Sequence, residues 1–275
     1  MRVRKVWAVY FSGTGTTAKT VREIAKVAAE GLGSPWESVN FSRPKVRQED
    51  LRFSVDDLVI VGTPVYAGRV PNLLLPYLKE KLEGAGALAV PVVLFGNRNY
   101  DDALMELRNI LQENHFACIA GAAFVGEHSF SDTLGKGRPD AEDMEKIRQF
   151  GRAVAEKVQD LPWAPEEPVA VGGEDPIRPY YKPRDRHGNF INILKVKPKT
   201  DTALCDECGK CVQLCPMGAI DPTHPALVPG ICVKCGACIK GCPMGAKYYD
   251  DPGYLYHKTE LEEMYARRAE VETFL

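Results

Sequence analysis

The sequence has little that would indicate a membrane-spanning or nucleic-acid-binding protein. Its longest apolar run, residues 87–95, is interrupted by Pro91 and is far shorter than the roughly 20 residues of a membrane helix. Acidic and basic residues nearly balance, 37 against 35, and the formal net charge is only -2. We therefore expect neither membrane insertion nor nucleic acid as a partner, because nucleic-acid-binding surfaces are strongly basic.

Cysteine is almost absent outside one short segment. Eight of the nine cysteines lie between Cys205 and Cys242, and only Cys118 lies outside it. This clustering excludes a chain-wide disulfide framework and favours a metal-binding module. The apolar N-terminal stretch Val6–Phe11 is too short for a secretory signal and has no small-residue cleavage site after it. We expect a cytoplasmic protein with reduced thiols, and Cys118 as a buried, unreactive one.

The first 161 residues alternate short apolar runs with amphipathic patterns. Strands are predicted over residues 3–11, 36–41, 57–62, 88–95 and 117–125, and helices over residues 16–32, 71–82, 101–114 and from residue 140 onward. Strands that alternate with helices form a parallel sheet covered on both faces. The sequence therefore predicts a doubly wound α/β domain with a five-stranded parallel sheet over residues 1–161.

The rest of the chain divides into three parts. Residues 162–200 are rich in proline and predict a linker or irregular extension that packs in part on a neighbouring domain or a second subunit. Residues 201–250 hold the cysteines and predict a small α+β domain. Residues 251–275 are charged, and we expect them to form a helical extension that caps the smaller domain.

The cysteines occur in an internal repeat with an offset of 27 residues. Both halves have the spacing C-x2-C-x2-C-x3-C-P, which is typical of bacterial ferredoxins with two 4Fe-4S clusters, where the fourth cysteine binds the other cluster. The first cysteine set is then Cys205, Cys208, Cys211 and Cys242, and the second cysteine set is Cys232, Cys235, Cys238 and Cys215. The alternative is structural zinc, but zinc sites use two separated pairs of ligands rather than three crowded ones.

A glycine-rich loop follows the first strand and precedes the first helix. A helix start of this kind supplies free N–H groups to a phosphate. The loop lacks the Gly-Lys-Ser/Thr of a P-loop ATPase, whereas a dinucleotide site with Arg43 on a 2′-phosphate stays open, as does a capped helix start without a ligand. The third interpretation is FMN, whose phosphate monoester suits the many donors of this loop: Ser12, Gly13, Thr14, Gly15, Thr16 and Thr17.

Two further loops follow strands of the same sheet, so they are expected at the same edge. Each supplies glycine for a close backbone approach and a tyrosine able to stack on a flat ring. The candidate cofactor-binding residues in these loops are Thr63, Pro64, Val65, Tyr66, Ala67 and Gly68 after the strand at 57–62, and Gly96, Asn97, Arg98, Tyr100 and Asp101 after the strand at 88–95.

The stretches FSGTGTTAKTV, TPVYAGRVP and FGNRNYDDAL, together with the cysteine repeat, resemble flavodoxin–ferredoxin fusion proteins of anaerobic microbes. The resemblance implies a flavodoxin-like domain with strand order 2-1-3-4-5, followed by a two-cluster 4Fe-4S ferredoxin domain. It also implies that Ser12, Thr14, Gly15, Thr16 and Thr17 bind the FMN phosphate, and that Tyr66, Gly68, Asn97 and Tyr100 contact the isoalloxazine. Arg69 and Arg98 depart from the family pattern and would favour the anionic reduced flavin if they approached the ring.

These features predict an iron–sulfur flavoprotein that passes electrons between its clusters, FMN and redox partner proteins. Transfer within one chain and transfer across a homodimer formed through residues 162–200 both stay open. The alternatives are a flavin-dependent reductase that is fed by its own clusters and acts on a small molecule, and a redox-sensing interaction protein. An electron carrier is favoured over a substrate-specific enzyme, because no acid/base pair accompanies Tyr66 and Tyr100.

Overall fold

A computed structural model describes all 275 residues. One seven-stranded sheet dominates it, with the order β11-β8-β6-β4-β1-β2 and β7 pairing with β6. The strands of this sheet are β1 (Lys5–Tyr10), β2 (Trp36–Asn40), β4 (Asp57–Pro64), β6 (Leu88–Phe95), β7 (Ala117–Cys118), β8 (Gly121–Val125) and β11 (Glu272–Phe274). All pairings are parallel except that of β11 with β8. The predicted five-stranded parallel sheet and its 2-1-3-4-5 order are confirmed, with an antiparallel strand added at one edge.

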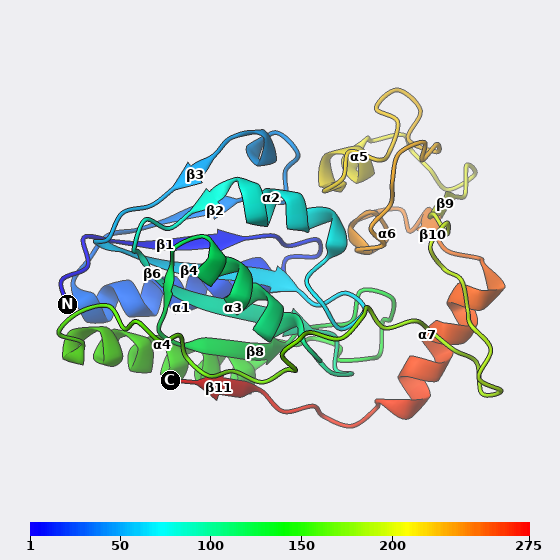
Figure 1. Cartoon of the computed structure of the whole chain (residues 1–275). Helices are drawn as coiled ribbons and strands as arrows, with labels where there is room; N and C mark the ends of the chain where they lie inside the picture. The colour runs from blue at the N-terminus through cyan, green and yellow to red at the C-terminus, as the bar shows by residue number, and fades with distance from the viewer.

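Helices cover both faces of this sheet (Figure 1). The first face carries α1 (Thr16–Leu32) and α4 (Ala141–Asp160), and the second carries α2 (Leu75–Glu80) and α3 (Ala103–Glu113). Two short 3-10 turns, η1 (Val46–Gln48) and η2 (Asn72–Leu74), and a small two-stranded sheet, β3 (Leu51–Arg52) with β5 (Leu82–Glu83), complete the α/β domain. None of the helices is long and apolar enough to span a membrane.

The central strands explain why the sheet forms here. All eight residues of β6 are buried, as is nearly all of β4, which is the pattern of a parallel strand covered on both sides. Alternate side chains of these strands enter two separate apolar cores, one under α1 and α4 and the other under α2 and α3. The carboxyl ends of the strands are thereby held rigidly at one edge of the sheet.

The cysteine-rich domain, residues 199–250, lies beyond this carboxyl edge (Figure 1). It contains β9 (Lys199–Thr200), α5 (Lys210–Leu214), α6 (Ala237–Lys240) and β10 (Lys247–Tyr248), and β9 pairs with β10 in an antiparallel ribbon. Each short helix begins after a glycine in the left-handed conformation, Gly209 with φ 68° and Gly236 with φ 73°. The two halves of the sequence repeat thus adopt the same local structure.

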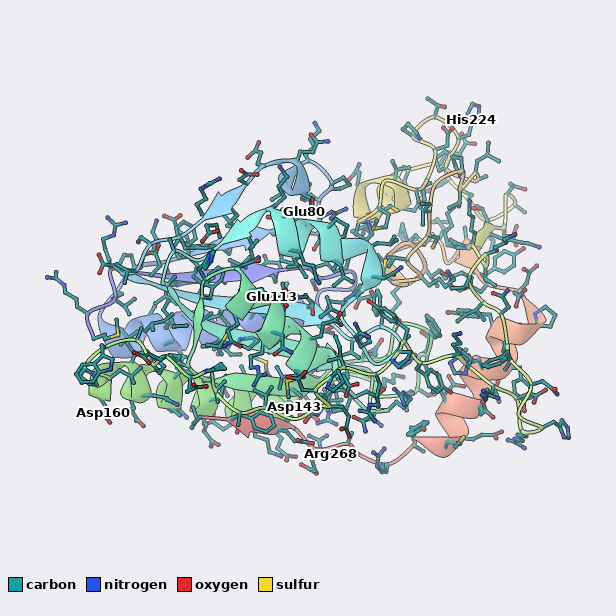
Figure 2. The ribbon with its side chains drawn as sticks, viewed as in Figure 1. Glu80, Glu113, Asp143, Asp160, His224 and Arg268 are labelled. Atoms are coloured by element: carbon teal, nitrogen blue, oxygen red, sulfur yellow. The ribbon has the colours of Figure 1, made fainter.

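The C-terminal residues differ from the expected helical extension. The helix α7 (Pro252–Met264) starts at an Asp251 cap and ends at Met264, after which the chain returns to the α/β domain as β11. Backbone groups in residues 265–269 bond to Asn97 and Arg138, and these long-range contacts end the helix. Arg268 of this segment also donates to the Asp143 carboxylate of α4 at 3.3 Å, and Figure 2 labels both residues.

Two predicted elements are shorter than expected. The strand predicted over residues 117–125 is split into β7 and β8, which both pair with β6. The helix predicted over residues 71–82 is reduced to α2 preceded by the 3-10 turn η2, because Pro76 lacks an N–H and suits only the first turn of an α-helix.

Residues 162–198 run back along the α/β domain and are tied to it by specific bonds. The buried carboxylate of Asp102 accepts from the backbone amides of Glu174 and Arg178 and from the Arg178 guanidinium. These bonds, led by those of Arg178, hold the pKa of Asp102 well below its usual range. In the same segment, the Tyr181 amide donates a hydrogen bond to the Ala67 carbonyl oxygen at 2.8 Å. It is an ordered strap and not a free tether.

We expect Asp102→Asn to release this strap. The amide cannot balance the Arg178 charge, so residues 162–198 should be cut several-fold faster by limited proteolysis, whereas Glu174→Gln, at an exposed side chain, should leave the rate unchanged. Because the folded pKa is lowered, the stabilisation is complete above the ordinary carboxyl pKa of about 4 and is lost only as the pH falls well below it. Equal cleavage of the wild type and Asp102→Asn would show that other contacts hold the strap.

Candidate functional site

The loop between β1 and α1 presents unpaired backbone donors. Five amides donate to no acceptor within the protein, those of Gly13, Thr14, Thr16, Thr17 and Ala18. They surround the N-terminus of a 17-residue helix, whose dipole also favours negative charge. The arrangement is suited to a phosphate group.

Hydrogen bonds within and across loops hold this phosphate loop in shape. The Ser12 hydroxyl accepts from the Gly15 amide at 3.1 Å, and the Ser12 amide donates to the Ser42 hydroxyl at 2.7 Å. Thr17 is buried under the helix start, whereas Thr14 is exposed at the loop tip. The loop is therefore preorganised by Ser12 and Ser42, and its remaining donors face outward.

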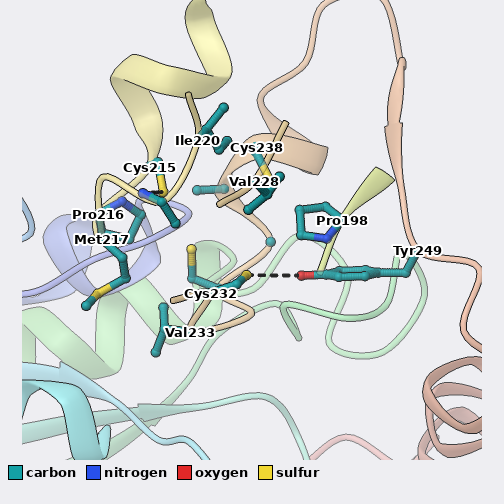
Figure 3. A pocket seen from close by; sticks show the side chains of 14 residues that line it. Pro198, Cys215, Pro216, Met217, Ile220, Val228, Cys232, Val233, Cys238 and Tyr249 are labelled. Atoms are coloured by element: carbon teal, nitrogen blue, oxygen red, sulfur yellow. Dashed lines mark hydrogen bonds between the residues drawn. The ribbon is translucent and has the colours of Figure 1, made fainter. Parts of the chain in front are cut away.

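The second cysteine set lines one small cavity of about 20 Å³ (Figure 3). Cys215 comes from the first half of the repeat, and Cys232, Cys235 and Cys238 come from the second. Apolar residues such as Ile220 and Val228 complete the wall. The fold thus brings together the four thiols that the spacing assigns to one cluster, across the two halves.

This cavity favours uncharged thiols until a metal is bound. Burial raises the pKa of Cys235 and of Cys238 to about 12. Thiolates in such surroundings require compensating cationic charge, which cluster iron supplies. The Tyr249 hydroxyl lies 3.9 Å from Cys232 Sγ (Figure 3), and hydrogen bonds of this type help to set a cluster's reduction potential.

The first cysteine set lies farther out in the same domain. Cys208 is exposed and Cys211 is buried, and burial raises the Cys211 pKa with a further contribution from Cys205. The Ala246 amide donates to Cys242 Sγ at 3.3 Å, just as the Ala219 amide donates to Cys215 Sγ at 3.2 Å in the other half. The two halves offer matching environments to their fourth cysteines.

The cysteine spacing is what favours clusters over zinc. A cubane binds each thiolate through a different iron, whereas a zinc ion binds all its sulfur ligands itself, at about 2.3 Å. Each half of the repeat crowds three cysteines into seven residues and adds a fourth before proline, which suits the cubane.

The second cysteine set is in direct contact with the phosphate loop. A Cβ placed on Gly13 would lie only 2.8 Å from the Cβ of Cys235, so only glycine permits this approach. Similarly, a Cβ on Gly236 would lie 2.5 Å from the Ser129 carbonyl oxygen. The backbone of the cysteine loop therefore touches the loops that follow β1 and β8.

Two cationic side chains fasten this contact. Lys240 of α6 forms an ion pair with Glu127 and donates to the carbonyls of His128 and Ser131, at 2.9 and 2.8 Å. Arg47, which follows β2, donates to the Pro216 carbonyl at 2.6 Å. The cysteine-rich domain is thus anchored over the carboxyl edge of the parallel strands, where α/β proteins bind ligands.

The strand β4 ends with Thr63 and Pro64, and the turn that follows it at Val65 brings Tyr66 to the same edge of the sheet. Its backbone closes on Arg69 through two hydrogen bonds of 2.9 and 3.2 Å, with Ala67 and Gly68 at the tip. Burial, together with the thiols of Cys235 and Cys232, raises the Tyr66 pKa well above its usual value. Tyr66 therefore lies between the α/β domain and the second cysteine set.

The side chains of Asn97 and Tyr100, in the loop after β6, bond to the C-terminal segment of the chain. Tyr100 is only 6% exposed, its ring packs on Phe95, and its hydroxyl donates to Glu272 of β11 at 2.6 Å. The Asn97 amide nitrogen, beside Gly96, donates to the carbonyls of Tyr265 and Arg267. The C-terminal segment thus occupies the side-chain amide of Asn97 and the hydroxyl of Tyr100, and their contacts with a flavin ring stay a prediction.

The two arginines of these loops also have protein partners. Arg69 forms a bidentate pair with the buried Glu106, and Arg98 pairs with Asp101 and stacks on Tyr181. Neither guanidinium is free to approach a bound ring, so the expected effect of these charges on a flavin is not supported.

Several residues that shape the site were missed in the sequence. Lys240, Arg47, Ser42 and Tyr249 act through contacts between segments far apart in the chain, which spacing does not reveal. The repeat offers only a weak signal for Lys240. Its two halves agree at nine of sixteen positions, and Lys240, which stands where the first half has Gln213, is one of seven that differ.

The comparisons with known proteins agree with this division of the chain. Models of 4Fe-4S binding domains match residues 198–221 and 229–245. No curated protein matches the chain. Among solved structures, a flavodoxin from the domain Archaea is 14% identical, covers 56% of this chain and 99% of its own, and has a TM-score of 0.39.

Two other solved structures match the same part of the chain. A flavodoxin of Streptococcus pneumoniae TIGR4 is 18% identical over 56% of this chain and 99% of its own, with a TM-score of 0.39. The rubredoxin oxygen:oxidoreductase of Desulfovibrio gigas is 16% identical over 57% of this chain and 37% of its own, also with a TM-score of 0.39. With its 2-1-3-4-5 strand order and its two 4Fe-4S motifs, the chain joins an N-terminal flavodoxin-like domain to a C-terminal 4Fe-4S ferredoxin-type domain.

Proposed function

We propose that this chain is an electron-transfer protein in which FMN, bound at the phosphate loop, exchanges electrons with two 4Fe-4S clusters. The observation that carries the proposal is the contact between Gly13 of the phosphate loop and Cys235 of the second cysteine set. It holds a cluster ligand beside the FMN-binding loop within one chain, so transfer requires no second subunit.

The residues of the α/β domain fit the phosphate end of FMN. The five unpaired amides of the loop and the hydroxyls of Thr14 and Thr16 can surround a phosphate monoester. Of the two candidate tyrosines, Tyr66 would contact the ring, because the hydroxyl of Tyr100 is bonded to Glu272. When bound, FMN accepts one or two electrons, whereas each cluster carries one at a time.

The two cysteine sets differ in exposure, which suggests an order of transfer. The first set includes the exposed Cys208, and the second set lies against the α/β domain. Electrons from a redox partner protein would enter at the first cluster, pass to the second and then reach FMN, or follow the reverse path. A partner with a basic surface would complement the negative charge of the outer cluster.

The alternative, a reductase of a small molecule, receives less support. A substrate needs an opening beside the ring, and the loop after β6 is instead covered by the segment that starts at Tyr265. An exposed first cluster, by contrast, is what a protein partner requires.

Stopped-flow reduction tests the proposed relay. With anaerobic protein that contains about eight iron atoms and one FMN per chain, a one-electron reductant should bleach the clusters first and the flavin bands in a coupled second phase. Lys240→Met should keep both cofactors but slow the second phase several-fold, because it loosens the docking of α6. Lys79→Met, at an exposed side chain of α2, should have no effect. Independent reduction of clusters and flavin in the wild type would refute the relay.

Paired cysteine substitutions test the ligand sets. If Cys215 and Cys235 bind the same cluster, Cys215→Ala/Cys235→Ala should lose about four of eight iron atoms, and Cys215→Ala/Cys205→Ala should lose all of them. If each repeat instead bound its own cluster, the Cys215/Cys235 pair would lose all the iron and the Cys215/Cys205 pair would lose about half of it. Cys118→Ala should retain all iron. Iron analysis and electron paramagnetic resonance distinguish these outcomes.

A negative charge in the phosphate loop tests the flavin site. Thr14 is exposed at the loop tip, so Thr14→Glu should leave the fold intact and repel the phosphate, weakening FMN binding by roughly tenfold or more. Ser38→Glu, on the exposed side of β2, is the matched control. Fluorescence titration of flavin-free protein measures the affinity. An unchanged affinity in Thr14→Glu would place the flavin elsewhere.

A further inference from the structure

Lys247 is a buried cation at the centre of the cysteine-rich domain. It lies in β10, pairs with Thr200 of β9, and is 3% exposed. Its ammonium group donates to the Pro225 carbonyl oxygen at 2.5 Å, and this is its only hydrogen bond to the protein. A buried lysine with a single neutral acceptor is costly, because burial removes the hydration of the charge.

The other buried cation of the chain, Arg138, has the carboxylate partner that Lys247 lacks. Arg138 is 5% exposed, and its guanidinium forms a bidentate pair with the buried carboxylate of Asp143. No carboxylate lies within 4.0 Å of the Lys247 ammonium group, whose one hydrogen-bond partner is the Pro225 carbonyl in the cysteine-rich domain. A cluster with its four thiolates carries net negative charge and can supply the missing counter-charge.

The internal repeat shows that a lysine is not required here for folding. Lys247 follows Cys242 by five residues, and the equivalent position after Cys215 is Ile220, which is 4% exposed. Ile220 packs against Cys211 of the first cysteine set and Cys238 of the second. The repeat maps Cys211 and Cys238 onto each other, so Lys247 has the position in the second half that Ile220 has in the first, beside the same two thiols. There its charge opposes the rise in thiol pKa that burial causes. The two halves are therefore alike in geometry and differ in charge.

We propose that Lys247 is a positioning residue that raises the reduction potentials of both clusters together, by holding a positive charge beside the first and the second cysteine set. The proposal rests on the cluster-binding part of the proposed function and not on the flavin. On reduction, a cluster gains one electron and therefore one negative charge. A nearby fixed cation stabilises that reduced state more than the oxidised one, and the low-dielectric interior strengthens the effect. Sharing one cation between the clusters would keep their potentials close.

Three substitutions at this position separate charge from structure. Lys247→Ile copies the first repeat, Lys247→Gln keeps a hydrogen-bond donor for Pro225 without the charge, and Lys247→Arg keeps the charge. Lys199→Ile, which removes an exposed lysine of β9 that pairs with Asp250, is the control. Each anaerobic protein is first assayed for iron and is then titrated potentiometrically, with electron paramagnetic resonance as the readout.

We expect the isoleucine and glutamine variants to hold about eight iron atoms and to reduce at lower potential at both clusters. A tenfold fall in the equilibrium constant corresponds to about 59 mV for a one-electron couple. The arginine and Lys199 variants should match the wild type. Unchanged potentials in the glutamine variant, a shift at one cluster only, or loss of iron from both neutral variants would overturn the proposal. Zinc in place of iron in the wild type would instead refute the cluster assignment beneath it.

Discussion

The arrangement of the whole molecule depends on one close approach, that of the second cysteine loop to the phosphate loop. At Gly13 there is no room for a side chain, because the Cβ of Cys235 occupies the space. Such an approach is maintained only if both loops are rigid and correctly placed. The phosphate loop is held by Ser12 and Ser42, and the cysteine loop is held by Lys240, which reaches three acceptors after β8. Side-chain contacts around the two loops thus determine the distance between the proposed cofactors.

This approach also creates an electrostatic problem. Reduced clusters and a phosphate are all negative, and they would repel one another in a region with little water. The fold supplies positive groups close to these negative charges. They are the unpaired amides at the start of α1, Arg47 at the Pro216 carbonyl, and Lys247 in the cysteine-rich domain. The net charge of the whole chain is therefore near zero, although positive groups are concentrated around the proposed cofactor sites.

The parts of the fold that could be predicted are those with local or repeated signals. Buried parallel strands such as β4 and β6 are continuous apolar runs, and the cysteine repeat predicts a 4Fe-4S binding domain by its spacing. The roles of Asn97 and Tyr100 could not be predicted, because their partners at residues 265–272 are about 170 positions away. β11 was missed for the same reason, since a three-residue edge strand has no period of its own.

The return of the C-terminus to the sheet gives the two domains a second connection. The strap of residues 162–198 leads out of the α/β domain, and α7 with β11 leads back into it. Between these connections, Tyr254 of α7 packs its ring against Tyr249 at 4.2 Å and against Phe130 at 4.6 Å, which joins the second cysteine set to the loop after β8. A domain held at both its ends and by an aromatic contact in the middle cannot swing freely. For the proposed electron transfer this rigidity would be an advantage, because no flexible linker would have to become ordered before electrons could pass between the two domains.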